Sequence, residues 1–302
     1  MIPRADSPLR RRNLRNGLLF CGPALVGLTV LTLYPVAASL YYSVCDYSVL
    51  EPPLYIGLAN YKRMLTDYLV NTALYNTVYF AVFSVPIGML VAFSLALLLN
   101  AKVRGQAIYR TIFFIPSIVP VVALSVLWLW ILGPQYGILN SLLRGLGLPT
   151  PGWMADPHWA KPALILMSTW GVGGWIVIYL AGLQDVPTEL YEAADLDGAS
   201  VVQKLKFITL PMMSPHLFFT LVMGLIVSFQ FFTQAMVMTG GTGNPDSSTL
   251  FYSMYIFQNA FQQFKMGYAC ALAWLLFVII LTATLLIFKT SARYVYYHAE
   301  QR

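Results

Sequence analysis

The chain has 302 residues, of which 58% are hydrophobic and only 10% are charged, and its formal net charge is +6. This composition is too apolar for a soluble domain of that length, so a lipid bilayer must be its solvent. The positive charge does not indicate nucleic-acid binding, because the basic residues are spread over separate loops instead of forming one basic stripe.

Six runs without Asp, Glu, Lys or Arg follow one another along the chain, at about residues 18–44, 72–99, 112–132, 163–184, 207–238 and 266–288. Each supplies the roughly 20 residues that a helix needs to cross the hydrocarbon core. Unpaired backbone polar groups are costly in lipid, and the runs are too long and too uniformly apolar for barrel strands. The sequence therefore predicts an all-α integral membrane protein with six transmembrane helices.

The first run follows an Arg-rich segment, and residues 37–39 could serve as the cleavage region of a signal peptide. The run is longer than a usual signal core and continues beyond these small residues, so we interpret it as a transmembrane helix. Trp128 and Trp130, near the end of the third run, are expected to anchor the chain at the outer membrane boundary.

The basic residues predict the orientation of the helices. Most of the 18 lie before the first run, between the second and third, between the fourth and fifth, or after the sixth: Arg4, Arg10, Arg11, Arg12, Arg15, Lys102, Arg104, Arg110, Lys204, Lys206, Lys289, Arg293 and Arg302. The loops of the other side contain Lys62, Arg63, Arg144, Lys161 and Lys265. By the positive-inside rule we expect a cytoplasmic basic segment at 1–17, a membrane domain at 18–289 and a cytoplasmic tail at 290–302.

The cytoplasmic loop at about 185–211 is predicted to form two short helices joined by a turn. Pro187 suits the first turn of one helix, and Asp197-Gly198 is a turn dipeptide. Ser200 and Gln203 match a capping box for a second helix, at 201–210, which Pro211 would end.

The same loop resembles the cytoplasmic coupling loop of ABC import permeases, whose pattern is EAA, three residues, Gly, nine residues and Ile-x-Leu-Pro. The matching residues are Glu192, Ala193, Ala194, Gly198, Ile208, Leu210 and Pro211. The resemblance implies that the ATPase-coupling residues Glu192, Ala193, Ala194, Asp197 and Gly198 form coupling helices that sit in a cleft of an ATP-hydrolysing subunit. The alternative interpretation is a solvated amphipathic connector.

The chain lacks a phosphate-binding loop of its own, because residues 240–243 (GGTG) are followed by Asn-Pro with no lysine. We therefore expect no ATPase site, no cofactor and no metal in this chain, with ATP and Mg²⁺ bound by a partner. An ion-coupled secondary transporter, the alternative, usually has Asp, Glu or His within the membrane. Among Asp, Glu and His, the six runs contain only His216, near the start of the fifth run. An integral-membrane enzyme would need a set of catalytic residues that His158, His216 and His298 do not supply.

Further segments resemble the carbohydrate branch of this family, the relatives of the maltose and glycerol-phosphate permeases. They are residues 22–24 (GPA), 34–35 (YP), 57–61 (GLANY), 109–110 (YR), 115–116 (IP) and 267–269 (GYA). The resemblance implies a type I ABC importer permease in the inner membrane of a bacterium or archaeon. Its implied partners are a second homologous permease subunit, an ATPase subunit dimer and an extracytoplasmic substrate-binding protein.

The resemblance also implies a substrate pathway. Positions that match the sugar site of the maltose transporter are Ser117, Ser168, Val172, Trp175, Phe229, Gln230 and Thr233. Gln230, Thr233 and Gln234 are spaced to share one face of the fifth helix. Alternatively, they only make bonds between helices. Uncharged runs favour a neutral mono- or oligosaccharide over glycerol phosphate, because a phosphate site would normally offer Arg or Lys. A polyol and glycerol phosphate are the alternative substrates, since a helix N-terminus could bind the phosphate instead.

Overall fold

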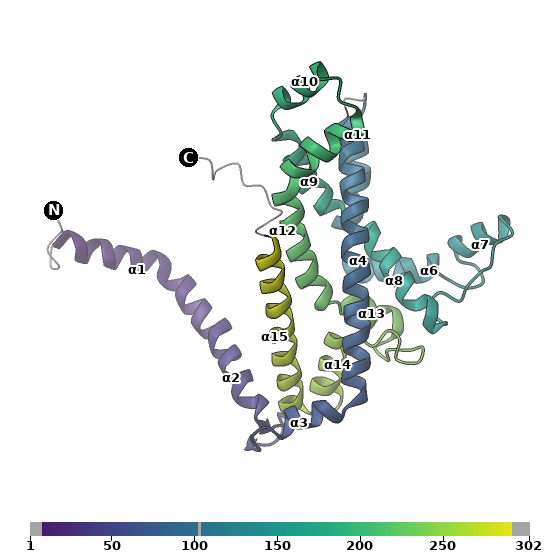
Figure 1. Cartoon of the computed structure of the whole chain (residues 1–302). Helices are drawn as coiled ribbons and strands as arrows, with labels where there is room; N and C mark the ends of the chain where they lie inside the picture. Colours follow the sequence, from purple (N-terminus) through teal and green to yellow (C-terminus); the bar gives the residue numbers. More distant parts are fainter. Residues whose placement is uncertain (1–7, 102–103, 292–302) are drawn as a thin grey trace. The chain divides into compact units, whose positions relative to one another are not determined.

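A computed structural model describes residues 8–101 and 104–291 of the chain (Figure 1). Arg4, Lys102, Arg293 and Arg302, on which part of the predicted orientation rests, lie outside the described residues, as does most of the predicted tail. The chain divides into two compact units, Met1–Thr66 with Asn259–Trp274, and Asp67–Gln258 with Leu275–Arg302.

Four stretches are long and apolar enough to cross a membrane as single helices: Arg12–Ser43, Tyr68–Asn100, Val201–Phe229 and Met266–Ser291. Two bent pairs pass the same test together. They are Gln106–Ile118 with Val121–Ile131, bent by 100°, and Pro157–Trp170 with Gly173–Gln184, bent by 48°. The described residues therefore contain up to six spans, in agreement with the predicted six-helix fold. The bends were not predicted, and they lie at Pro120 and at Gly171-Val172.

The first unit begins with α1 (Pro8–Leu28), a π-helical turn η1 (Thr29–Leu33) and α2 (Tyr34–Ser43). A two-stranded antiparallel hairpin follows, β1 (Cys45–Asp46) and β2 (Leu54–Tyr55), with Cys45 opposite Tyr55 and Asp46 opposite Leu54. Then comes α3 (Ala59–Thr66), and the unit also contains most of η3 (Gln258–Gln262) and the start of α15 (Met266–Ser291).

Two segments that carried the family resemblance meet in this unit. The Asn60 side chain donates to the carbonyls of Ser43 and Cys45 at 3.0 and 2.9 Å. A Cβ added to Gly267 would lie 2.1 Å from the Cys45 carbonyl oxygen, so only glycine fits there. These residues fix how the hairpin, α3 and the start of α15 pack together.

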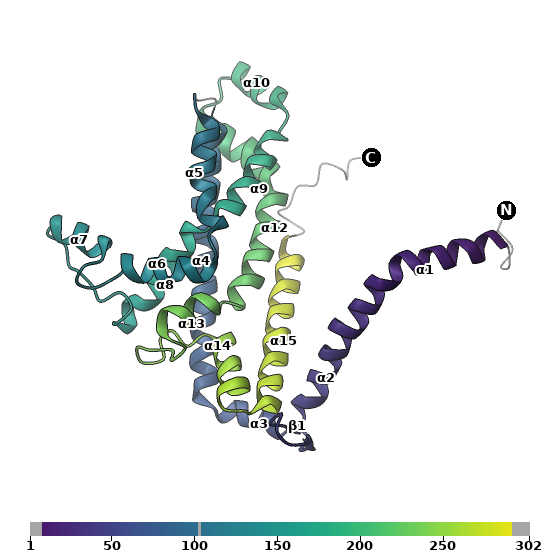
Figure 2. The same cartoon turned by 180° about the vertical axis from the view of Figure 1, so that it is seen from behind.

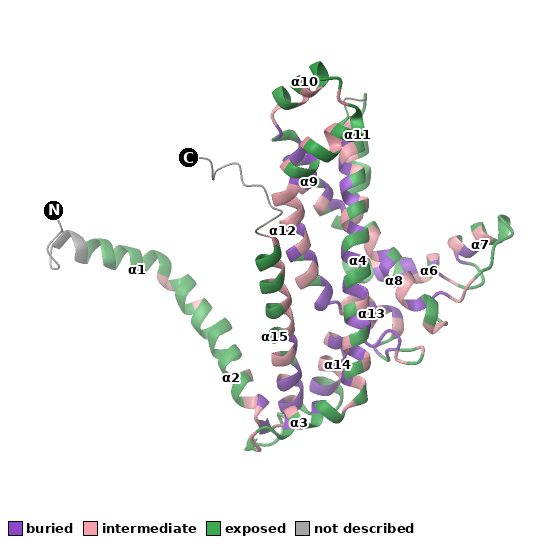
Figure 3. Cartoon of the chain, viewed as in Figure 1, coloured by how far each residue is buried: buried purple, intermediate pink, exposed green. Residues whose placement is uncertain are grey.

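The second unit is built around α4 (Tyr68–Asn100), which packs against α8 (Pro157–Trp170), α9 (Gly173–Gln184), α12 (Leu210–Phe229) and α14 (Tyr252–Phe257). Its other elements are α5 (Gln106–Ile118), α6 (Val121–Ile131), α7 (Ile138–Gly145), α10 (Thr188–Leu196), α11 (Val201–Lys204), η2 (Leu205–Thr209), α13 (Thr233–Thr239) and the end of α15. Figure 3 shows buried residues along α4 and α9. Tyr179 of α9, fully buried, meets Phe93 edge-on and shares a 2.6 Å hydrogen bond with Thr220.

Pro211 does not end a helix, which corrects one prediction. α11, η2 and α12 form one continuous stretch, Val201–Phe229. The π turn before Pro211 lets the Leu210 N–H bond to the Leu205 carbonyl, one residue further back than in an α-helix. This wider turn accommodates a proline that has no N–H of its own. The same device precedes Pro35, where the Tyr34 N–H bonds to Thr29.

The fifth span is shorter than predicted, because its helix ends at Phe229 instead of continuing to residue 238. Phe231 instead packs into a buried aromatic cluster, with ring centroids 4.1 Å from Phe80 and 5.0 Å from Phe251. Short turn hydrogen bonds from the N–H groups of Gln230 and Phe231 close the helix. The helix thus ends where the Phe231 ring is buried, instead of continuing its backbone hydrogen bonds. The prediction that Gln230, Thr233 and Gln234 share one helical face is therefore wrong.

The two tryptophans near the third span differ. Trp130 is 76% exposed, as expected of an interface anchor, but Trp128 is 4% exposed and stacks edge-on against Trp170 at 5.4 Å. The prediction that Trp128 is an interface anchor is therefore wrong, because its indole is part of the packing between α6 and α8.

Candidate functional site

The predicted coupling loop projects beyond the ends of α4, α9 and α12 in the second unit (Figures 1 and 2). Its first helix, α10, begins after Pro187 and ends at Leu196. Glu192 and Ala193 are exposed on it, and Ala194 is half-buried. The loop therefore presents the matched residues at one end of this unit.

Gly198 ends α10 in a way that its residue type dictates. Its φ of 71° is left-handed, a conformation that costs other L-residues free energy. The Ala199 N–H bonds to the Ala194 carbonyl at 2.8 Å, and the Gly198 N–H bonds to the Asp195 carbonyl at 3.1 Å. This pair is the Schellman pattern of a helix C-terminus. The predicted Asp197-Gly198 turn is thus present.

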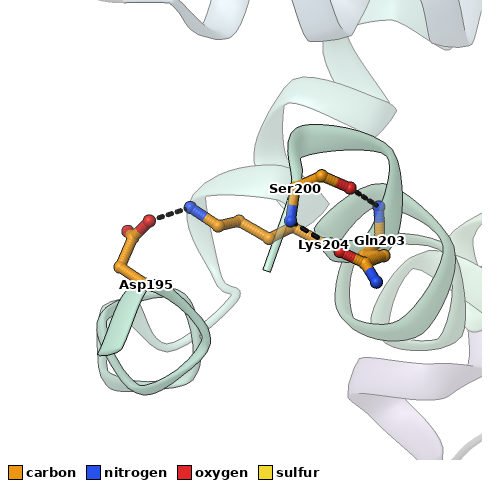
Figure 4. Close-up of polar contacts among 4 residues, drawn as sticks. All are labelled: Asp195, Ser200, Gln203 and Lys204. Carbon is orange, nitrogen blue, oxygen red and sulfur yellow. Dashed lines mark hydrogen bonds and ion pairs between the residues drawn. The ribbon is translucent and has the colours of Figure 1, made fainter. Parts of the chain in front are cut away.

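The second short helix starts at the predicted capping box (Figure 4). The Ser200 N–H donates to Gln203 Oε1 at 2.7 Å, and the Gln203 N–H donates to Ser200 Oγ at 3.4 Å. Across the turn, Lys204 Nζ forms an ion pair with Asp195 of α10. Figure 4 shows this pair bridging α10 and α11.

A second bridge lies at the base of the loop, where the Tyr191 and Thr209 hydroxyls are 2.9 Å apart. Between the two helices lies a groove of about 400 Å³, lined by Ala194, Asp197, Gly198, Ala199, Gln203, Lys204, Phe207 and Ile208. Leu196, Val201 and Phe207 are 91%, 81% and 67% exposed. An exposed apolar patch of this kind on a polar loop is typical of a protein-binding surface.

A cavity of about 280 Å³ lies within the second unit, between α4, α6, α8, α9, α12 and α13. Its lining consists of Phe80, Ser84, Val85, Gly88, Leu124, Met167, Ser168, Gly171, Val172, Trp175, Gly224, Val227, Ser228, Phe231 and Gln234. None of these lining residues, which all belong to the described part of the chain, carries a charge. The cavity therefore offers hydroxyl and amide groups beside aromatic rings, the combination that binds neutral sugars.

The predicted pathway residues are only partly brought together. Ser168, Val172 and Trp175 line the cavity. Ser117 is exposed on α5, where its Oγ lies 2.8 Å from the position of a Cβ added to Gly173. Three others do not belong to the lining: buried Phe229, exposed Gln230 and half-buried Thr233. Their roles as pathway residues remain predictions.

The sequence analysis did not single out the contribution of α4. Phe80, Ser84 and Gly88 are four residues apart, so they follow one face of α4 into the cavity. This spacing of one aromatic and two small residues in an apolar run was a signal that could have identified the face. Gln234 lines the cavity because the break after Phe229 starts a new helix at Thr233.

The loop after α13 is attached to α4 just beyond this face. The side-chain amide of Asn76, which is buried, donates to the carbonyls of Ser247 and Leu250 at 2.7 and 3.0 Å. Its oxygen accepts a bond from Lys161 Nζ at 2.9 Å. The next residue, Thr77, accepts a bond from the Tyr252 N–H at 2.9 Å. The loop after α13 and the cavity lining are thus both attached to α4.

Asp156 caps α8 outside the apolar part of the span. The His158 backbone N–H donates to Asp156 Oδ1 at 2.8 Å, and this bond lowers the pKa of the carboxyl below its ordinary value of 3.8. The ionised carboxylate is therefore the form that stabilises the start of α8.

Comparison with known proteins agrees with this architecture. The model of the family described as "Binding-protein-dependent transport system inner membrane component" matches residues 84–302. The chain is 40% identical over 304 residues to the probable ABC transporter permease protein YesP of Bacillus subtilis, with 98% of each chain covered. It is 34% identical over 297 residues to the lactose transport system permease protein LacF of Rhizobium radiobacter, covering 96% of this chain and 99% of LacF.

A solved structure shows the same fold. It is a chain of a bacterial alginate ABC transporter in complex with an alginate pentasaccharide-bound periplasmic protein. The TM-score is 0.82 at 23% identity, and the match covers 95% of this chain and 98% of that one. The chain therefore belongs to the family of inner-membrane components of binding-protein-dependent transport systems, and it is a membrane-spanning permease of an ABC importer with the type I fold.

Proposed function

We propose that this permease carries a neutral mono- or oligosaccharide, delivered by an extracytoplasmic binding protein, through a pathway that includes the cavity between α4, α9 and α12. It works as one of two homologous permease subunits above a dimer of ATPase subunits, which bind ATP and Mg²⁺. Both termini and the coupling loop lie in the cytoplasm.

The observation that carries the substrate class is the uncharged lining of the cavity. Ser84, Ser168, Ser228 and Gln234 supply hydrogen-bonding groups, and Trp175 supplies an aromatic face. A sugar needs both, because its hydroxyls bind polar groups and its C–H faces pack on rings. The relatives named above include a lactose permease, which supports the same class.

The coupling loop supports ATP as the energy source. α11 continues without interruption through η2 into α12, as the 29-residue stretch Val201–Phe229. Val227 and Ser228, near the far end of that stretch, line the cavity. A force applied by an ATPase subunit to Glu192, Asp197 and Gly198 would pass to α11 through the turn and the ion pair of Asp195 with Lys204, and then along one helix to the cavity, by rigid-body motion.

The test is uptake into proteoliposomes that contain the complete complex, supplied with saccharide-loaded binding protein. In vesicles whose lumen corresponds to the cytoplasm, we expect uptake to require ATP inside the lumen. We also expect loaded binding protein to stimulate ATP hydrolysis. Glu192→Arg should abolish both without preventing membrane insertion. Uptake driven by a proton or sodium gradient without ATP would refute the proposal and favour an ion-coupled carrier.

A further inference from the structure

Trp175 lies where three helices of the second unit meet. It is in the first turn of α9, and two glycines face its ring from the neighbouring helices, Gly88 of α4 and Gly224 of α12. A Cβ added to Gly88 would lie 3.0 Å from Trp175 Cζ3. A Cβ added to Gly224 would lie 2.9 Å from both Cη2 and Cζ2. The indole thus occupies a slot between Gly88 and Gly224, and a larger residue at either position would close this slot.

Two valines restrict the movement of the indole in the slot. The Cβ positions of Gly88 and Gly224 also lie 3.5 Å from Val172 Cγ1 and 3.1 Å from Val85 Cγ1, so both sides of the slot are filled. Trp175, Val172 and Val85 all line the cavity, which is the adjoining free volume. Because protein interiors are close-packed, a side chain added at either glycine would displace the indole instead of being absorbed by free space.

Trp175 also contacts the packed core of the second unit. Trp175 packs against a buried cluster that includes Ala92, Phe93, Ile176 and Tyr179. These residues lie beyond the cavity along both helices, in the direction of the coupling loop: α4 lines the cavity at 80–88 and the cluster at 92–99. The indole therefore separates the cavity from the packed core, and it is the floor of the cavity.

We propose that Gly88 and Gly224 are positioning residues that hold the Trp175 indole as the cavity floor, and that this slot sets the length of saccharide that the permease accepts. The inference rests on the proposed function, because it assumes that saccharides enter this cavity. It assigns a role in size selection to two glycines of the cavity lining that have no side chain with which to bind a saccharide.

The expected effect follows from the geometry. In Gly224→Ala the new methyl would lie too close to Cη2 and Cζ2, so the indole must shift until ordinary contact distances return. We expect it to shift into the adjoining cavity, which becomes shallower. One methylene more or less in a binding pocket changes discrimination by about 10- to 200-fold. We therefore expect uptake of the longest accepted saccharide to fall by about tenfold or more, and uptake of the monosaccharide to fall much less. Alanine favours helix more than glycine, so the backbone itself does not oppose the change.

The experiment measures uptake of a mono-, di- and trisaccharide of one sugar, each taken up by the wild-type complex in proteoliposomes. The variants are Gly88→Ala, Gly224→Ala and the double variant Gly224→Ala/Trp175→Phe, whose smaller ring lacks the outer atoms of the indole. The control is Gly27→Ala on α1, where an added Cβ meets no described atom within 4 Å. Subunit assembly is measured for each by size-exclusion chromatography in detergent.

The proposal predicts a shift of selectivity toward the monosaccharide in both glycine variants and its reversal by Trp175→Phe. If Gly224→Ala fails to assemble, Trp175→Phe should restore assembly, because the same contact causes the defect. Equal loss of all three saccharides, or a defect that Trp175→Phe does not relieve, would overturn the inference. Failure of the wild-type complex to take up any saccharide would instead refute the proposed function, so the two failures are distinguishable.

Discussion

Gly198 offers a direct test of how the coupling loop works, because conformation and size make opposite demands at this position. Its left-handed φ of 71° costs an ordinary L-residue about 1 to 2 kcal/mol, but asparagine tolerates the region better. An added Cβ would meet no described atom within 4 Å outside its own turn, so the chain itself has room for a side chain. Gly198→Ala and Gly198→Asn therefore separate the two demands.

If the turn acts through its backbone conformation, Gly198→Ala should perturb coupling more than Gly198→Asn, although alanine is smaller. A cost of 1 to 2 kcal/mol lowers the population of the native turn by a factor of about 5 to 30. The two hydrogen bonds that end α10, from the N–H groups of Gly198 and Ala199, would be lost with it.

The assay is ATP hydrolysis stimulated by loaded binding protein, together with saccharide uptake, in proteoliposomes with matched protein levels. Gly147→Ala is the control, because Gly147 has a similar φ of 69° and open surroundings in the loop after α7. It should leave the ratio of uptake to ATP hydrolysis unchanged. If activity follows side-chain volume, with alanine better than asparagine, the loop acts by close approach to the ATPase and the conformational reasoning is wrong.

Three further predictions concern the cavity, the outer loop and the start of α8. Gln234→Ala removes an amide from the cavity and should reduce uptake by about twofold to tenfold, which corresponds to the loss of one hydrogen bond between neutral groups. Gln230 is exposed, so Gln230→Ala should reduce uptake less, and equal effects of the two variants in transport assays would contradict the prediction. Asn76→Ala leaves the buried Leu250 carbonyl without its partner, at about 1 to 3 kcal/mol, and removes the part-buried bonds to Ser247 and Lys161, so the melting temperature of the detergent-solubilised complex should fall clearly. An unchanged melting temperature would refute the role of Asn76 as an attachment point. Asp156→Ala should destabilise the chain at neutral pH, because the pKa of Asp156 is lower in the folded than in the unfolded chain and its carboxylate therefore stabilises the fold. This stabilisation is present above the ordinary pKa of 3.8 and is lost as the pH falls through the lower pKa of the folded chain. A stability difference from wild type that persists in stronger acid would contradict this prediction.

The sequence alone determined the fold class, the order of the membrane spans, and the turn and capping box of the loop between the fourth and fifth spans. Membrane spans are set by long apolar runs, because lipid leaves the backbone no partner but its own helix. The loop could be predicted because its determinants are local. The turn at Gly198 and the capping box at Ser200 and Gln203 depend on hydrogen bonds between residues at most five positions apart.

The tertiary structure alone decided the cavity and its floor. The helix break at Gln230 results from packing of Phe231 against Phe80 and Phe251, which are distant in sequence, so a rule based on helical spacing could not foresee it. Likewise, Gly88 and Gly224 are separated from Trp175 by dozens of residues. Their importance appears only when three helices bring backbone and indole within contact distance, because close packing is a property of the folded chain and not of any one segment.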